Sequence, residues 1–351
     1  MKAYKLVQWG QPGEYVQVPK PKPGPMDVLI RVKASGLCRS DLDMMDTQPG
    51  QPPYATAIKP GYILGHETAG YVEELGELIT DLKKGEAVIL HHLRVCGFCE
   101  YCIAGVEQNC EFYRVGDIGE TRGCGIDGGL AEFIVAPRSQ MISLGTCDPV
   151  IYAPLADAGI TAYSGCQQFV SRLRPGMSAV VIGVGGLGSF AVQFLKILSG
   201  AQVIAVDNSE DRLKIATDVG ADATVLSGDG AVDKVKEITN GRMVDAVIDF
   251  VGIDQTLLLA TKILRPQGHI SVVGMDGGSV RLGWNYMPTN ATFSLSFAST
   301  RAHLREVCKL AMDGKLKIDV DRFSFDQIPE AYDRLRNGKL KGRAVVVMDD
   351  A

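Results

Sequence analysis

The stretch AVVIGVGGLG, residues 179–188, decides the fold of the second half of this chain. Residues 179–182 form a continuous apolar run typical of a buried strand, and apolar residues at helical spacing follow the glycines. Gly183, Gly185 and Gly188 satisfy the G-x-G-x-x-G pattern between the two. In that setting the glycines permit a tight turn, close approach of the backbone to a pyrophosphate, and close packing of helix on strand. The stretch therefore predicts a dinucleotide-binding strand, turn and helix.

The same alternation of strand and helix continues along the chain. Residues 203–206, 244–250 and 269–273 are expected to form strands, and a helical pattern covers residues 257–264. Strands that alternate with helices pack as a parallel sheet with helices on its faces. We expect a doubly wound parallel sheet in an α/β domain.

Asp207 stands at the end of the strand that follows the glycine-rich turn. A carboxylate there accepts hydrogen bonds from the adenosine ribose hydroxyls and repels a 2'-phosphate, which favours NAD over NADP. The alternative role for Asp207 is a turn former or helix cap at the strand end. Arg212 either lies along the adenosine or is a solvated helix residue.

The first half of the chain has a different pattern of apolar, proline and glycine residues. Apolar and polar residues alternate over residues 27–35, as in a half-buried strand, and prolines and glycines punctuate residues 21–85. This pattern favours an irregular β-barrel-like domain with few helices before residue 155. Near the C-terminus, an apolar helical stripe covers residues 304–311 and a last apolar strand covers residues 344–347.

Four cysteines follow the pattern C-x2-C-x2-C-x7-C: Cys96, Cys99, Cys102 and Cys110. Four thiolates complete a tetrahedral zinc shell and leave no position for chemistry, so this zinc is expected to hold a loop. An iron–sulfur cluster is the rival. The bacterial ferredoxin pattern, however, has a shorter last gap and a proline after the fourth cysteine, whereas Glu111 follows here. The pattern favours a structural zinc.

Composition narrows the functional class. At 351 residues the chain exceeds the usual size of one core, which predicts two domains, and 46% hydrophobic residues suffice to fill both. The net charge of -5 leaves no basic surplus for nucleic acid or anionic lipid, and the N-terminus lacks the apolar core of a secretory signal. We expect a cytoplasmic protein with no nucleic-acid and no membrane partner. The nine cysteines suggest metal ligation rather than disulfides.

A further pattern, Gly65-His66-Glu67-x2-Gly70-x5-Gly76-x2-Ile79, resembles the signature of zinc-containing medium-chain alcohol dehydrogenases. Residues 38–41, 155–159 and 342–344 match that family too, in particular bacterial NAD-dependent secondary alcohol dehydrogenases. The resemblance covers the whole chain. It implies a GroES-like irregular β-barrel catalytic domain at residues 1–155, with the zinc lobe at about residues 94–112. A Rossmann doubly wound sheet at residues 156–293 would be inserted before a segment, residues 294–351, that returns to the catalytic domain.

The resemblance also implies a catalytic zinc held by Cys38, His66 and Asp157, and thus two zinc ions per chain. Asp157 replaces the second cysteine of many relatives, and a carboxylate is a legitimate but harder zinc donor. Ser40 is expected to hydrogen-bond the substrate oxygen and pass on its proton. Glu67 is expected to orient the ligands.

Asp43 stands where many relatives carry a histidine that completes the proton relay. Either Asp43 or a chain of water molecules takes over that role, or Asp43 is a solvated aspartate beside Asp41.

By the same resemblance the chain binds NAD and forms a homodimer or homotetramer. The residues expected at the cofactor are Arg39, Thr161, Gly183, Gly185, Gly186, Leu187, Gly188, Asp207, Arg212, Val251, Val273, Gly274 and Arg343.

The expected reaction is hydride transfer between NAD(H) and an apolar secondary alcohol and its ketone. Apolar residues between the first two proposed ligands either line a substrate pocket or pack in the core: Met44, Met45, Tyr54, Ile58 and Tyr62. Small residues at 298–300 suggest room for a bulky or cyclic substrate. The alternatives are a polyol dehydrogenase of the sorbitol or butanediol type, a zinc-independent reductase, and a non-catalytic NAD-binding protein.

Overall fold

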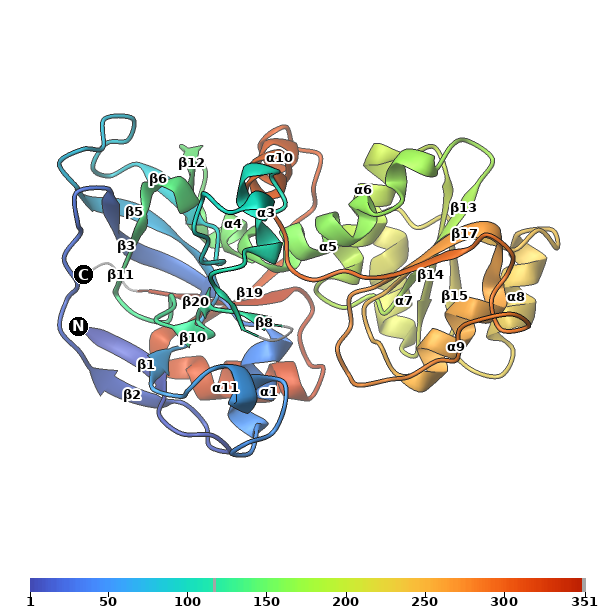
Figure 1. Cartoon of the computed structure of the whole chain (residues 1–351), viewed down its shortest axis with the longest axis horizontal. Coiled ribbons are helices and arrows are strands. Elements are labelled where there is room, and N and C mark those ends of the chain that lie inside the picture. Colours follow the sequence, from blue (N-terminus) through green and yellow to red (C-terminus); the bar gives the residue numbers. More distant parts are fainter. Residues whose placement is uncertain (116–117, 349–351) are drawn as a thin grey trace. The chain divides into compact units, whose positions relative to one another are not determined.

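The computed structural model describes residues 1–115 and 118–348, which divide into two compact units (Figure 1). Unit 1 comprises Met1–Ala158, Ser299–Gly314 and Ile318–Ala351, and unit 2 comprises Gly159–Ala298 and Lys315–Lys317. The chain therefore leaves unit 1 after Ala158 and returns to it at Ser299. Over the described ranges, no helix is long and apolar enough to cross a membrane.

Unit 2 contains a parallel sheet in the order β15-β14-β13-β16-β17-β18. Its strands are β13 (Ser178–Ile182), β14 (Gln202–Asp207), β15 (Ala223–Leu226), β16 (Val244–Asp249), β17 (Leu264–Val272) and β18 (Thr292–Leu295). The helices that connect them are α6 (Gly188–Leu198), α7 (Glu210–Asp218), α8 (Ala231–Ile238) and α9 (Asp254–Ile263). The predicted doubly wound sheet is confirmed. Its strand order reverses at β13, where such sheets bind ligands.

The sheet of unit 2 is held by β-branched side chains. Val180, Ile204 and Val247, on three neighbouring strands, are all 0% exposed. Side chains of this kind suit the pleated surface of a strand, and full burial of each contributes about 1.5–3 kcal/mol. Burial on both faces explains why the sequence reads as continuous apolar runs.

Unit 1 is built around the long strand β3 (Asp27–Gly36). It pairs antiparallel with β5 (Glu67–Leu75), β11 (Phe133–Pro137) and β20 (Arg343–Val347). The sheet continues beyond these strands through β6 (Ala87–Leu90), β12 (Met141–Gly145) and β19 (Val320–Ser324), and a smaller sheet contains β1 (Lys2–Leu6), β2 (Glu14–Gln17) and β4 (Tyr62–Ile63). Strands β19 and β20 of the C-terminal segment thus belong to the same sheet as strands of the first half of the chain.

Short elements complete the fold. The remaining helices are α1 (Arg39–Asp46), α2 (Tyr54–Ala57), α3 (Glu100–Ile103), α4 (Pro149–Tyr152), α5 (Ala158–Gln167), α10 (Arg301–Met312) and α11 (Ile328–Arg336). The remaining strands are β7 (Arg114–Val115), β8 (Ile118–Gly119), β9 (Thr121–Arg122) and β10 (Gly125–Ile126). The predicted stripe over residues 304–311 is the buried face of α10. All nine cysteines are free thiols.

His269 on β17 is a buried polar residue in the sheet of unit 2. Its Nδ1 lies 2.6 Å from Thr292 Oγ1, and its Nε2 lies 3.0 Å from Ser294 Oγ, both on β18. Burial, together with the nearby charge of Arg172, lowers the pKa of His269 to about 4. His269 is therefore neutral in the folded protein at neutral pH.

We predict that His269 makes unit 2 sensitive to acid. Because its folded pKa lies below the unfolded value of about 6.5, the unfolded chain binds the proton first. Its contribution to the free energy of unfolding is fully present above pH 6.5 and is lost as the pH falls towards 4. Thermal melts of wild type and His269→Gln across this range should show a difference in Tm that narrows with falling pH. A constant difference would contradict the prediction.

Candidate metal and dinucleotide sites

Three predicted ligands from separate parts of unit 1 lie together. Cys38 immediately precedes α1, His66 stands between β4 and β5, and Asp157 follows a 3-10 turn at residues 153–156. One potential ligand atom from each lies within 4.8 Å of the others, and His66 Nε2 is 3.5 Å from Asp157 Oδ2. Thiolate, imidazole and carboxylate are all zinc donors, and three of them leave a fourth position for a substrate oxygen. These residues fit a catalytic zinc.

Asp41 orients the histidine of this cluster. Its Oδ1 lies 3.2 Å from His66 Nδ1, and its Oδ2 accepts the backbone N–H of Cys38 at 2.9 Å. Metal-ligating histidines usually donate their second ring N–H to a carboxylate, which fixes both the tautomer and the ring. The Asp41 carboxylate therefore lies beside Nδ1 of His66 while Nε2 lies nearer Asp157, and its hydrogen bond ties Cys38 to the first turn of α1.

Glu67 and Arg343 form a buried ion pair behind the cluster. Arg343 donates to Glu67 through Nε at 3.1 Å and Nη2 at 2.5 Å, and Nη2 also lies 3.7 Å from Asp157 Oδ2. Gly36 faces Glu67 across β3 and β5, and a Cβ at Gly36 would lie 1.8 Å from Glu67 Oε2. The missing side chain at Gly36 thus makes room for the carboxylate, which in turn holds the arginine against Asp157.

The electrostatics of the cluster favour a cation. Burial lowers the pKa of His66, but Asp41, Asp157 and Cys38 outweigh it and raise this pKa well above its usual value. Burial raises the pKa of Asp157, yet its hydrogen bond and charge interaction with His66 hold this pKa well below the usual range. Burial also raises the pKa of Glu67, against the lowering effect of Arg343. Surroundings that favour positive charge on His66 suit a divalent metal ion.

His92 lies beside the same cluster. Its ring is 6.0 Å from that of His66, and its Nδ1 lies 2.8 Å from the carbonyl oxygen of Ala156. Because a carbonyl only accepts hydrogen bonds, Nδ1 carries the proton. His91 stacks on His92 with ring centroids 5.5 Å apart. His92 therefore lies at the catalytic cluster, between His91 and His66.

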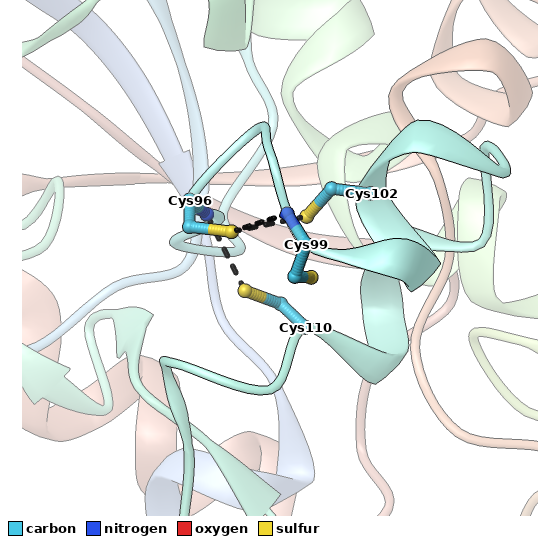
Figure 2. Close-up of side chains that lie close together, drawn as sticks. All are labelled: Cys96, Cys99, Cys102 and Cys110. Carbon is cyan, nitrogen blue, oxygen red and sulfur yellow. Dashed lines mark hydrogen bonds between the residues drawn. The ribbon is translucent and has the colours of Figure 1, made fainter.

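The four-cysteine lobe gathers its sulfur atoms in one place (Figure 2). The ligand atoms of Cys96, Cys99, Cys102 and Cys110 all lie within 4.8 Å of one another. Cys96 Sγ accepts the backbone N–H of Cys99, and Cys110 Sγ accepts that of Cys96, each at 3.3 Å. Such N–H groups stabilise thiolate over thiol. Four converging thiolates fit a metal ion with a complete tetrahedral coordination shell.

The glycine-rich turn of unit 2 has the geometry that its motif predicts. Gly183 has a φ of +82°, and a Cβ at Gly188 would lie 1.9 Å from the Gly183 carbonyl oxygen. A Cβ at Gly185 would meet nothing within 4 Å. Gly183 therefore makes the turn, Gly188 lets α6 pack against it, and Gly185 presents open backbone to a ligand.

Asp207 ends β14 beside this turn. Its Oδ2 accepts the backbone N–H of Val184 at 2.7 Å, and its Oδ1 accepts that of Ser209 at 3.0 Å. The carboxylate is thus fixed at the carboxyl end of the sheet. Other predicted cofactor residues of unit 2 also follow strand ends, namely Val251 after β16, and Val273 and Gly274 after β17. Arg212 is on α7 and Thr161 on α5.

The other predicted contacts lie in unit 1. Arg39 Nε is 3.5 Å from Asp43 Oδ1 on the exposed side of α1. Ser40 Oγ lies 3.7 Å from Cys38 Sγ. Arg343, expected at the cofactor, contacts Glu67 and Asp157 in the structure, and its cofactor role stays a prediction.

Sequence reasoning missed two features of this cluster. Asp41 was noted only as part of the motif at residues 38–41, although a carboxylate three residues after a ligand could have suggested the partner of His66. The contact of Arg343 with Glu67 joins residues 276 positions apart, and no local pattern could have indicated it.

The residues weighed as a substrate wall are buried in unit 1. Met44, Met45, Tyr54, Ile58 and Tyr62 range from 0% to 8% exposed. Tyr62 donates to Met44 Sδ at 3.0 Å, and Gly13 donates its backbone N–H to Met45 Sδ at 3.3 Å. The two methionines therefore pack in the core of unit 1, whichever residues line the pocket.

Comparison with known proteins identifies the family of the chain. Residues 24–146 match the family described as alcohol dehydrogenase GroES-like domain, and residues 186–313 match the zinc-binding dehydrogenase family. The NAD-dependent alcohol dehydrogenase of Sulfurisphaera tokodaii is 33% identical over 354 residues, which cover 99% of this chain and 100% of that protein.

Solved structures similar to this chain include alcohol dehydrogenases as well. The alcohol dehydrogenase of Aeropyrum pernix has a TM-score of 0.90 at 36% identity, and the match covers 99% of this chain and 100% of that one. The acetophenone reductase of Geotrichum candidum, solved with NAD, has a TM-score of 0.84 at 28% identity, covering 99% and 96%. This chain therefore belongs to the zinc-containing medium-chain dehydrogenase family, among its alcohol dehydrogenases.

Proposed function

We propose that this protein is a zinc-dependent enzyme that interconverts a bulky or cyclic apolar secondary alcohol and its ketone, with NAD as hydride acceptor. That it is an NAD-dependent alcohol dehydrogenase follows from its family. The observation that carries the chemistry is the convergence of Cys38, His66 and Asp157, with ligand atoms within 4.8 Å.

Zinc, when bound there, supplies a Lewis acid that stabilises the alkoxide form of the alcohol near neutral pH. The residues of the chain hold and orient this site. Asp41 fixes the ring of His66, and Arg343, held by Glu67, lies 3.7 Å from Asp157. We assign to Ser40, beside Cys38, the hydrogen bond to the reacting oxygen.

The proton leaves Ser40 towards Asp43. Ser40 and Asp43 stand three residues apart on α1, so their side chains are neighbours on that helix. A carboxylate on the exposed side of α1 is suited to pass a proton to solvent, directly or through water.

The apolar substrate class is supported by two observations. The Geotrichum candidum relative is an acetophenone reductase, and acetophenone is a bulky apolar ketone. Residues 298–300 of this chain are small, which suits a roomy site.

The proposal includes two zinc ions per chain, one in each cysteine-containing cluster. It also includes a homodimer or homotetramer. Leu295 on the edge strand β18 is 78% exposed, and Trp284, in a turn between β17 and β18, is 84% exposed. An open edge strand and exposed apolar side chains favour pairing with a second copy. The free cysteines suit a reducing compartment, and we propose the cytoplasm.

A substrate panel tests the reaction. With NAD+ we expect kcat/KM for cyclohexanol and 1-phenylethanol to exceed that for ethanol, sorbitol and 2,3-butanediol, measured by NADH absorbance. With NADP+ the rate should be lower because Asp207 repels the 2'-phosphate. A preference for ethanol would reject the bulky substrate, and a preference for sorbitol or butanediol would favour a polyol dehydrogenase. Bound zinc without hydride transfer to any alcohol would favour a non-catalytic protein.

Asp157→Asn tests the catalytic metal. Since the amide is a poor zinc ligand, the variant should hold one zinc per chain instead of two, with kcat/KM lowered by about 100-fold or more. Elemental analysis and steady-state kinetics measure both. Asp81→Asn is the matched control, because Asp81 is an exposed carboxylate of unit 1 that pairs with Arg138 at 2.7 Å. Full zinc content in Asp157→Asn would show that Asp157 is not a ligand.

Asp43→Asn tests the proton route. We expect kcat to fall by about 10-fold and the pH dependence of kcat to change, because the amide cannot accept the proton. Asp46→Asn is the control, since Asp46 lies on the same helix and pairs with Arg336 at the surface. An unchanged pH–rate profile for Asp43→Asn would show that Asp43 does not accept the proton, which would leave a chain of water molecules as the proton route.

A further inference from the structure

An ion pair joins the four-cysteine lobe to the start of α10. Glu107 Oε1 accepts both the backbone N–H and the Nε–H of Arg301, each at 2.8 Å, although the two residues are 194 positions apart. The Glu107 side chain is 6% exposed and that of Arg301 is 28% exposed. Hydrogen bonds to a buried carboxylate are stronger than those of a solvated surface pair. This contact is therefore a firm attachment between two distant segments of unit 1.

On one side, the attachment secures the segment that re-enters unit 1. The chain returns to unit 1 at Ser299, and Arg301 is the first residue of α10. Thr300 Oγ1 accepts the N–H of His303 at 3.1 Å, while Glu107 accepts the N–H of Arg301. Two of the unpaired N–H groups of the first helical turn are thus satisfied, and the carboxylate also suits the positive end of the helix dipole.

On the other side, the position of Glu107 depends on the cysteines. Cys110 donates its backbone N–H to the Glu107 carbonyl at 3.0 Å, so both belong to one tight turn. The lobe buries little apolar surface of its own, since Phe98, Ile103 and Phe112 are 63%, 76% and 60% exposed. A segment with so small a core needs a metal ion or another cross-link to define its shape.

We propose that Glu107 is a positioning residue that couples metal binding in the four-cysteine lobe to the order of the first turn of α10 and of the segment before it. The proposal rests on the lobe zinc proposed above. When the metal holds the cysteines, Glu107 holds Arg301; when the lobe loosens, the first turn of α10 frays and Ser299 loses its support.

Hydrogen exchange on the zinc-loaded enzyme tests the attachment. In Glu107→Gln, the amides of residues 301–304 should exchange at least about tenfold faster than in wild type, as expected when a charge-assisted hydrogen bond is weakened. The zinc content should stay unchanged. Glu120→Gln is the matched control, since Glu120 pairs with Arg94 at 2.8 Å and is half-exposed. Equal exchange in Glu107→Gln and wild type would overturn the proposal.

Cys110→Ser tests the coupling, because it removes one lobe thiolate and leaves Cys38, His66 and Asp157 intact. We expect it to lose one zinc per chain and to accelerate exchange at residues 301–304 to the level of Glu107→Gln. The double variant should show no further acceleration. If the acceleration of exchange in the double variant equalled the product of the accelerations in the two single variants, the coupling would be contradicted. Unchanged zinc content in Cys110→Ser would also overturn it, whereas the proposed substrate and hydride transfer would stand.

Discussion

The structure depends on the balance of buried negative charge in unit 1. Asp41 and Glu67 are both 0% exposed, and Cys38 and Asp157 lie with them around His66. An unpaired buried charge costs several kcal/mol, so positive charge has to be brought to the same place. Arg343 supplies part of it and is held there by β20, which lies beside β3. The remaining excess of negative charge is what a divalent metal ion would balance.

Local patterns were enough to predict much of the molecule. The turn at Gly183 and the strand before it are adjacent in sequence, and the positive φ of Gly183 and the close contact of Gly188 with the Gly183 carbonyl both arise within that turn. The doubly wound parallel sheet and the family followed correctly from such patterns, whereas the order of the strands came only from the structure. The cysteine spacing is local as well, and its four sulfur atoms do converge. That they bind zinc stays a prediction, as do the roles of Ser40 and Asp43.

Contacts between distant segments could not be predicted in the same way. In the sequence, nothing distinguishes Glu107 from the other charged residues of the lobe. Only in the folded chain does it contact Arg301. The resemblance places Arg343 at the cofactor, and that role stays a prediction; its contact with Glu67 becomes visible only in the folded chain. Gly36 is another example. Its small size matters because β5 places a carboxylate opposite it, and nothing in the neighbouring sequence reveals that carboxylate.

The position of β20 has a consequence for the order of assembly. This strand, made of residues 343–347, is inserted between β3 and β19. Unit 2 consists almost entirely of one continuous stretch and can collapse while synthesis proceeds, whereas the sheet of unit 1 has to wait for residues 343–347. During translation, β3 therefore emerges from the ribosome long before β20 exists. The edge of β3 that β20 later covers has to be kept from pairing with other nascent chains.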